Sequence, residues 1–306
     1  MTCKTTCTAV DLFAGAGGWT TGAIQAGVQV VAAVNHWPRA VETHAANHPD
    51  VLHRCQDVTL MDPRDLPRHD MLIASPACTG HTRARGKERP HHDASRATAW
   101  AVVDVAEVTH PRLLLVENVP EFRQWRLYRA WWAALTLLGY HLEEHFLDAA
   151  DFGVPQHRVR LYVVGRLGKP APRVVSPGLP HVPARTLVDW DAGVWRPVAE
   201  KVEATRNRVA RGRAAYGERF VMSYYGTSET GRSLDRPLGT VPAADVWAAV
   251  DGDNMRMLTV PELQRAMGFP DDYVVLGPRE DQTKQLGNAV VPPVAREVVR
   301  QVLEQS

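Results

Sequence analysis

The first half of the chain alternates short apolar runs with segments of helical spacing. The apolar runs predict strands and lie at residues 8–14, 28–34, 70–75, 112–118 and 158–166. Between them, apolar residues recur with the 3.6-residue period of helices in a segment ending at Ala26 and at residues 38–48, 94–110 and 128–139. Strands that alternate with helices in this way predict an α/β fold built on a parallel sheet, with helices on both faces.

The alternation stops after residue 166. The next stretch, 167–185, is rich in Pro and Gly, and residues 185–273 show no regular succession of strands and helices. Further on, Thr259 followed by Glu262 predicts a helix N-cap. We therefore expect a large domain, a small domain and a C-terminal segment that completes the large one, with these bounds: 1–168, 169–280 and 281–306.

The C-terminal segment has its own pattern, "KQLGNAVVPPVAREVVRQVLEQ". It predicts a turn at Gly287 and Asn288 and then an amphipathic helix. Pro292 and Pro293 suit the first turn of that helix, where a backbone N–H has no partner within the helix.

Composition narrows the class of protein. The 306 residues are 45% hydrophobic and 23% charged, which excludes a disordered or fibrous chain. No uncharged apolar run is long enough to span a bilayer, and the N-terminus lacks the apolar core of a signal peptide. We expect a cytoplasmic protein without a membrane partner.

Cysteine spacing and charge distribution add two observations. The 4 cysteines are too few and too irregular for a disulfide framework, and the lone pair Cys3 and Cys7 leaves a zinc site as an alternative. The net charge is only +1, but residues 83–96 hold five Lys or Arg against two acids, and residues 196–219 hold seven against three. These clusters favour a nucleic-acid partner, with solvated charged faces as the alternative.

A glycine-rich loop follows the first predicted strand, in "DLFAGAGG". Gly15, Gly17 and Gly18 would let backbone approach a ligand at the start of a helix, which favours negative charge. The loop is no full G-x-G-x-x-G, so a nucleotide-like ligand and a plain tight turn both stay open. After the second strand, where such folds often carry an acid for ribose, the chain has His36 and Trp37.

Two chemically active side chains end two other strands. Cys78 lies just past "DMLIASPA", in a turn next to basic residues that favour its thiolate form, and Glu117 ends "LLLVEN". In a parallel sheet these ends meet at one edge, where ligands bind. In "PQHRVRLY", alternation along a strand would direct three polar side chains to one face: Gln156, Arg158 and Arg160.

Five motifs in order carry a resemblance: "DLFAGAGG", "SPAC", "VENV", "QHRVR" and "KQLGNAVVPPVA". Together they resemble the DNA (cytosine-5)-methyltransferase family, over residues 10–166 and 256–296. The resemblance implies a Rossmann-like methyltransferase sheet, a small target-recognition domain, S-adenosyl-L-methionine as cofactor, double-stranded DNA as partner and no metal. It also implies a role in DNA methylation, as in restriction-modification, in a bacterium or a phage-infected cell. Because the recognition surface is small and unpaired, we expect a monomer.

The resemblance assigns roles to the residues that match its motifs. Cys78 would attack C6 of the target cytosine, Glu117 would hydrogen-bond N3, Asn118 would shape the pocket, and Arg158 and Arg160 would organise the site and contact the base. The cofactor would be bound by the following residues: Phe13, Gly15, Gly17, Gly18, His36, Trp37, Asp57, Pro76 and Asn288. The DNA would be contacted by the following residues: Arg83, Arg85, Gln156, Arg206, Arg208, Tyr224, Tyr225 and Arg232.

Two positions depart from the family pattern. The residue before the cysteine is usually proline, but here it is Ala77, with Pro76 one place earlier, so we expect a less rigid loop. The usual ribose-binding glutamate is replaced by His36.

Other readings remain open on the sequence alone. An oxidoreductase on the same layout would leave Cys78 and Glu117 without a role. A zinc site is a local alternative, built from these residues: Cys78, His81, His91 and His92. A catalytically weak or inactive DNA-binding member of the family and an RNA cytosine methyltransferase are the remaining alternatives.

Overall fold

A computed structural model describes residues 6–77, 98–224 and 228–306, which form two compact units. Unit 1 comprises the described parts of Met1–Asp148, Val159–Pro177 and Val290–Ser306, and unit 2 comprises those of Ala149–Arg158 and Gly178–Ala289. Residues 149–158 and 281–289 therefore group with unit 2, beyond the expected small domain of 169–280. The reading of unit 2 as a target-recognition domain stays a prediction.

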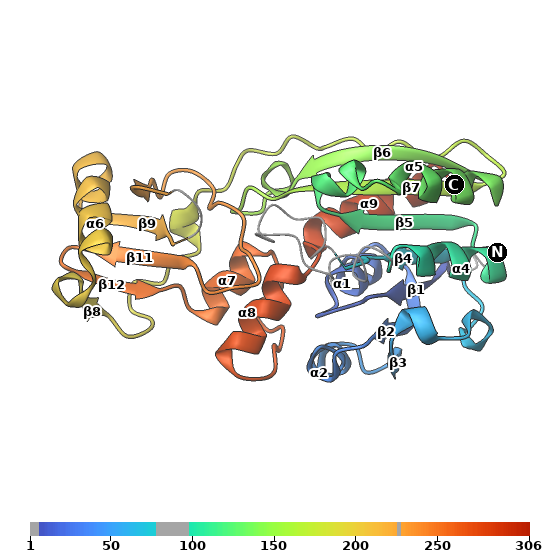
Figure 1. The fold of residues 1–306 in the computed structure, drawn as a ribbon, viewed down its shortest axis with the longest axis horizontal. Helices are drawn as coiled ribbons and strands as arrows, with labels where there is room; N and C mark the ends of the chain where they lie inside the picture. The colour runs from blue at the N-terminus through green and yellow to red at the C-terminus, as the bar shows by residue number, and fades with distance from the viewer. Residues whose placement is uncertain (1–5, 78–97, 225–227) are drawn as a thin grey trace, which may run out of the picture. The chain divides into compact units, whose positions relative to one another are not determined.

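Unit 1 is built on a seven-stranded sheet in the order β3-β2-β1-β4-β5-β7-β6 (Figure 1). Its strands are β1 Thr8–Leu12, β2 Gln29–Asn35, β3 Leu52–Cys55, β4 Met71–Ala74, β5 Leu113–Asn118, β6 Tyr140–Asp148 and β7 Val159–Leu167. Its helices of at least two turns are α1 Gly18–Gln25, α2 Pro38–Asn47, α4 Trp100–Thr109, α5 Tyr128–Leu137 and α9 Pro292–Glu304. The predicted α/β fold is thus confirmed.

The sheet departs from an all-parallel one at β7. This strand runs antiparallel to both β5 and β6, because β6 and β7 form a long hairpin. The apolar pattern did not predict β6, whose sequence "YHLEEHFLD" is charged in the middle, as an edge strand with a partly exposed face allows. The strand predicted from residue 158 begins at Val159, so Arg160 lies in it but Gln156 and Arg158 do not.

Helices cover both faces of the sheet. On one face, α4 and α5 bury apolar side chains such as Val102 and Trp131 against strand residues that include Leu72 and Val116. On the other face, the hydroxyl of Thr20 in α1 donates to Asp11 of β1. Burial of each large apolar side chain contributes roughly 1.5–3 kcal/mol, so this core dominates the stability of unit 1.

Helix α9 packs directly on α1, through glycines. A Cβ atom on Gly18 would lie 2.0 Å from the backbone oxygen of Val290, and one on Gly22 would lie 2.5 Å from the Cβ of Ala295. The two backbones can approach this closely only because both positions lack side chains. The C-terminal helix therefore returns to the sheet of unit 1, as the sequence predicted.

A chain of polar groups lies buried beneath α1. Thr20 donates to Asp11 Oδ2 at 2.8 Å, His44 Nε2 lies 3.0 Å from the Thr20 hydroxyl, and His44 Nδ1 lies 2.8 Å from His53 Nε2. Asp11 Oδ1 has no hydrogen-bond partner among the described residues. Burial raises the pKa of Asp11 to about 7, and burial together with the neighbouring His48 and His53 lowers the pKa of His44.

Unit 2 has a five-stranded antiparallel sheet in the order β10-β9-β11-β12-β8. Its strands are β8 Arg196–Pro197, β9 Arg219–Ser223, β10 Gly231–Arg232, β11 Trp247–Asp251 and β12 Asn254–Met257. Its helices of about two turns or more are α6 Glu203–Tyr216, α7 Val260–Ala266 and α8 Arg279–Asn288. Val209 of α6 packs on a core that includes Phe220 and Val250.

The predicted N-cap at Thr259 is confirmed, and the predicted turn at Gly287 is wrong. Thr259 and Glu262 form a reciprocal capping box at the start of α7, and Glu262 also binds Arg256 at 2.6 Å in a fully buried pair. Gly287 lies inside α8, where a Cβ would meet the backbone of Pro242 at 2.2 Å. The glycine there serves close packing, and the helix ends at Asn288.

Among the described residues, no helix combines the length and the apolar character needed to cross a membrane.

We predict that Gly18→Ala destabilises the protein by about 3 kcal/mol or more, because the new methyl group meets backbone that has no rotamer to change. Chemical denaturation measures this. The control Gly168→Ala fills open space and carries only the cost of its left-handed backbone, φ 67°, of about 1–2 kcal/mol. Equal losses for the two variants would contradict the packing role of Gly18.

We also predict that Asp11→Asn changes how stability depends on pH. The folded pKa of Asp11, about 7, lies above its unfolded value near 4, so wild-type stability is lost relative to the variant as pH rises between these values. The expected difference is roughly a few kcal/mol by pH 8. Both proteins keep His44, whose lowered pKa removes stability as pH falls below about 6.5, so that contribution cancels. Parallel curves of unfolding free energy against pH would contradict the prediction.

Candidate functional site

Four neighbouring parallel strands end at the same edge of the unit 1 sheet. Leu12 of β1 pairs with Val34 of β2 and Ala74 of β4, and Ala74 pairs with Val116 of β5. The residues just beyond these positions therefore share one edge: 13–18, 35–37, 75–77 and 117–118. Because β1 and β4 lie side by side while the chain continues from β1 to β2, the edge contains the point where strand order reverses, which is where ligands bind in such sheets.

The loop between β1 and α1 has an unusual backbone. Phe13, Gly15 and Gly17 all have positive φ angles, of 59°, 54° and 88°. Such strain in a residue other than glycine, here Phe13, concentrates at functional sites. Gly17 caps α1 without a side-chain hydrogen bond, and the first turn carries no acid, so the helix start favours an anionic group.

Gly18 has a different role from its two neighbours in the loop. Its missing side chain makes room for Val290 and not for a ligand. The sequence motif does not separate these roles, because it records only that glycine is present.

The ends of β2 and β3 place His36, Trp37 and Asp57 near one another. His36 is exposed and Trp37 half-buried, with the Trp37 backbone N–H donating to Asn35 Oδ1 at 2.9 Å. Asp57 accepts from the N–H and hydroxyl of Thr59 at 2.9 and 2.8 Å. The Thr59 N–H is the main cause that lowers the pKa of Asp57, and His36 adds to it, so this exposed carboxylate is ionised at neutral pH.

Glu117 forms an ion pair at the end of β5. Its Oε1 lies 3.4 Å from Nε of Arg160, and the two side chains are only 8% and 15% exposed. Arg160 also donates to the Val159 carbonyl at 2.8 Å, which holds the guanidinium in place. A carboxylate this buried needs such a partner. The ion pair brings two of the predicted site residues together at the end of β5.

Side chains from α1, from β5 and from the turn before α4 hold the turn after β4. Trp19 of α1 donates its indole N–H to Ser75 Oγ at 3.0 Å, Asn118 of β5 donates to the Pro76 carbonyl at 3.0 Å, and the Ala77 N–H donates to Thr98 Oγ1 at 3.1 Å. Asn118, one of the predicted site residues, therefore helps to hold the turn that leads to Cys78. Sequence reasoning missed the other three side chains, Trp19, Ser75 and Thr98, since no motif spacing links them.

Several predicted residues lie outside the described part of the chain: Cys78, Arg83, Arg85 and Tyr225. The alternative zinc ligands His81, His91 and His92 lie there too. Within residues 6–77, 98–224 and 228–306, no three His, Cys, Asp or Glu side chains are arranged to hold a metal ion.

Arg158 and Gln156 hold the backbone of unit 2. The Arg158 guanidinium donates to the carbonyls of Val241, Gly287 and Ala289 at 2.9, 2.9 and 3.1 Å and is 3% exposed. Gln156 is fully buried, with its amide donating to the Ala266 carbonyl and accepting from the Val241 N–H. The expected DNA contact of Gln156 is therefore wrong, and the geometry gives Arg158 a scaffold role in place of a contact with the base. The motif "QHRVR" does not distinguish these roles.

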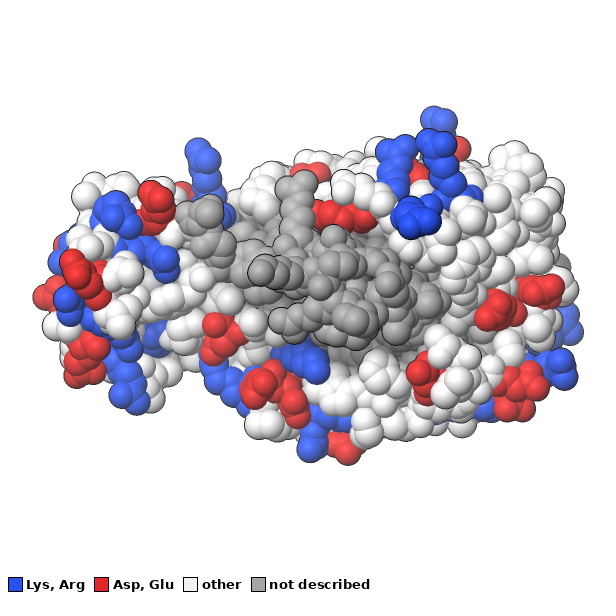
Figure 2. Space-filling model, viewed as in Figure 1, with Lys and Arg blue, Asp and Glu red and all other residues white. Residues whose placement is uncertain are grey.

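The other predicted contacts lie on the surface of unit 2. The guanidinium of Arg208 lies 5.6 Å from the centre of the Tyr224 ring, that of Arg232 lies 5.5 Å from the Trp247 ring, and Arg206 donates to the Lys201 carbonyl. Asn288 is exposed at the end of α8. Figure 2 shows basic side chains interleaved with acidic ones around α6, in keeping with pairs such as Arg213 with Asp253.

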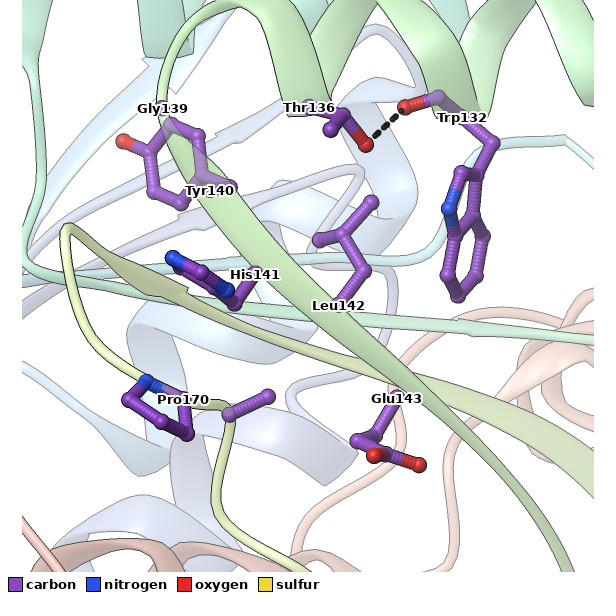
Figure 3. A pocket seen from close by; sticks show the side chains of 9 residues that line it. Trp132, Thr136, Gly139, Tyr140, His141, Leu142, Glu143 and Pro170 are labelled. Atoms are coloured by element: carbon purple, nitrogen blue, oxygen red, sulfur yellow. Dashed lines mark hydrogen bonds between the residues drawn. The ribbon is translucent and has the colours of Figure 1, made fainter.

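Two of the grooves on the described surface lie in different units. One, of about 420 Å³, lies between α5 and the edge strand β6 of unit 1 and is lined by Trp132, Leu142 and Glu143 among others (Figure 3). It contains none of the strand-end residues, so it is separate from the candidate site. The other, of about 490 Å³, lies in unit 2, and Arg196, Lys201, Tyr224 and Arg279 are among its lining residues. Its lining residues include no carboxylate, but Arg279 is paired with Asp245 at 2.8 Å and Arg256 with Glu262 at 2.6 Å, so these cations are partly neutralised.

Comparisons with known proteins agree on one family. Curated relatives include the Type II methyltransferases M1.HphI of Haemophilus parahaemolyticus, 29% identical over 98% of this chain and 87% of its own length, and M.NlaX of Neisseria lactamica, 28% identical over 96% and 95%. Similar solved structures include a prophage-encoded DNA modification methyltransferase of E. coli, with TM-score 0.73 and 20% identity over 98% of this chain and 99% of its own. The Dnmt2 methyltransferase of S. pombe has TM-score 0.69 and 17% identity, over 98% and 99%.

The family model of the C-5 cytosine-specific DNA methylases matches residues 7–187 and 189–304, nearly the whole chain. The matched residues include the glycine loop after β1 and the Glu117–Arg160 pair. The chain belongs to the family of C-5 cytosine-specific DNA methylases.

Proposed function

We propose that this chain transfers a methyl group from S-adenosyl-L-methionine to C5 of a cytosine flipped out of double-stranded DNA. The observation that supports this most directly is the meeting of four strand ends at one edge. That edge brings a glycine loop, the residues leading to Cys78 and the buried Glu117 into one site. A base inside a duplex cannot reach such a site, so the nucleotide leaves the stack first.

The residues at the edge fit S-adenosyl-L-methionine. The uncapped start of α1 suits its carboxylate, the backbone at Gly15 and Gly17 permits close approach, and Trp37 offers an aromatic surface for adenine. The ionised Asp57 accepts a hydrogen bond from an amino group, and Phe13, His36 and Asn288 complete the proposed set. When bound, the cofactor supplies an electrophilic methyl group.

The protein's part in the reaction is to make C5 nucleophilic. The Cys78 thiolate bonds to C6, and the electron pair of the C5=C6 double bond moves toward C5, which takes up the methyl group. Glu117, in its protonated form, donates its proton to N3 of the base and so stabilises the adduct, while Arg160 fixes the orientation of Glu117. A general base then removes the proton from C5, which restores the C5=C6 double bond and releases Cys78 from C6.

Unit 2 and the segment after Cys78 are proposed to bind the DNA. Arg83 and Arg85 follow the nucleophile in the sequence, and Arg206, Arg208 and Arg232 are cations of unit 2. Tyr224 and Tyr225 add aromatic surface. Arginine serves both phosphate contacts and the reading of guanine, which suits a domain that selects the target cytosine. By its likeness to Type II methyltransferases, we infer that the protein modifies DNA in a restriction-modification setting. Action as a monomer in the cytoplasm is a further part of the proposal.

We predict that the wild-type protein transfers tritiated methyl groups to cytosine in duplex DNA. Cys78→Ala should abolish transfer, because no other group on the site forms the bond to C6. Glu117→Gln should slow it by about 10²–10⁴-fold, the usual contribution of a positioned acid or base. Scintillation counting of DNA recovered from the reaction measures both.

The control is Glu143→Gln on the edge strand β6, which makes the same chemical change two strands away from β5 and should keep wild-type activity. Transfer by Cys78→Ala at the wild-type rate would refute the mechanism. Transfer to tRNA with none to DNA would show that the protein is an RNA cytosine methyltransferase instead.

A further inference from the structure

One hydrogen bond joins the two ends of the chain segment that contains Cys78. The backbone N–H of Ala77, the residue before Cys78, donates to the side-chain oxygen of Thr98 at 3.1 Å. We propose that Thr98 is a positioning residue for the nucleophile, acting through the backbone of Ala77. The inference rests on the proposed function, since it presumes that Cys78 is the attacking group.

The Thr98 hydroxyl completes a set of restraints on three consecutive residues. The Ser75 N–H donates to the Leu12 carbonyl at 3.2 Å and its hydroxyl accepts from Trp19, while the Pro76 carbonyl accepts from Asn118. Ala77 is bonded directly to Cys78, and the Thr98 hydroxyl accepts from its backbone N–H. Loss of this bond therefore acts on the residue next to the nucleophile, whereas the other restraints act on Ser75 and Pro76.

Thr98 stands on a fixed part of unit 1. Its carbonyl accepts from the Ala101 N–H at 3.2 Å, in the first turn of α4. The next residue, Ala99, is 1% exposed, and its carbonyl accepts the indole N–H of Trp131 at 2.9 Å. Contacts with α4 and α5 therefore fix the position of the Thr98 hydroxyl, and its hydrogen bond fixes the backbone of Ala77 relative to these helices.

The hydrogen bond from residue 77 to Thr98 requires a residue other than proline at position 77. A proline there would have no N–H to donate, so the Thr98 bond and a proline ring are alternative ways to restrain the same residue. The sequence suggested that Ala77 leaves the loop less rigid. The structure provides a hydrogen bond in place of the ring, and only a residue with a backbone N–H permits it.

The pairing is tested by a double-mutant cycle of Thr98→Val and Ala77→Pro, with kcat measured in the tritium-transfer assay. In the Ala77 background, Thr98→Val should lower kcat about tenfold with KM for both substrates and the melting temperature nearly unchanged, and Thr98→Ser should restore it. In the Ala77→Pro background, Thr98→Val should have no further effect. The matched control is Thr136→Val on α5, whose hydroxyl donates to the Trp132 carbonyl, and its kcat should equal that of wild type.

Each outcome decides the inference. An unchanged kcat in Thr98→Val, or equal losses with alanine and with proline at position 77, would overturn it. A loss confined to KM would do the same. If the wild type transfers no methyl group to DNA or RNA, the proposed function fails by itself. Hydrogen exchange of the Ala77 amide then tests the bond, since protection in wild type that is lost in Thr98→Val supports it and equal exchange overturns it.

Discussion

The parallel register of β2, β1, β4 and β5 is the constraint on which the site depends. Because Leu12, Ala74 and Val116 are paired across three strands, the residues that follow them leave the sheet at the same edge. The side chains of the site therefore come together from segments far apart in the sequence, and no single segment has to fold around a ligand. The buried core under α4 and α5 stabilises that register, so the geometry of the edge is set by the fold as a whole.

At that edge, polar side chains such as Glu117, Asn118 and Asp57 contact neighbouring strands or turns. Glu117 is paired with Arg160, Asn118 donates to the Pro76 carbonyl, and the hydrogen bonds from Thr59 lower the pKa of Asp57. Such bonds fix orientation in a site whose groups would otherwise be costly to bury. The same logic extends into unit 2, where Arg158 satisfies three backbone carbonyls with one guanidinium.

The sequence predicted the fold class, the strand ends and the Thr259 cap, because these follow from local patterns of apolar residues and capping side chains. It did not predict β6, whose charged middle hides an edge strand, or the reversal of β7, which is decided by pairing with distant residues. It grouped Gln156 and Arg158 with Arg160, although the strand begins between them at Val159 and the first two are buried in unit 2. The sequence also predicted that Gly18 binds a ligand and that Gly287 forms a turn. In the structure, both positions require glycine because the backbone of Val290 or Pro242 packs directly against them. Contacts of this kind join residues far apart in the sequence, so the local spacing of residue types does not predict them.

The central claim is that Cys78 forms a covalent bond with the target base while Glu117 stabilises the adduct. Duplex DNA with 5-fluorocytosine in place of cytosine tests this most directly, because fluorine at C5 cannot leave as the proton does and the adduct persists. With S-adenosyl-L-methionine present, we predict a protein–DNA conjugate that resists SDS and that peptide mass spectrometry maps to Cys78. Absence of any conjugate, from protein that methylates ordinary DNA, would contradict the account.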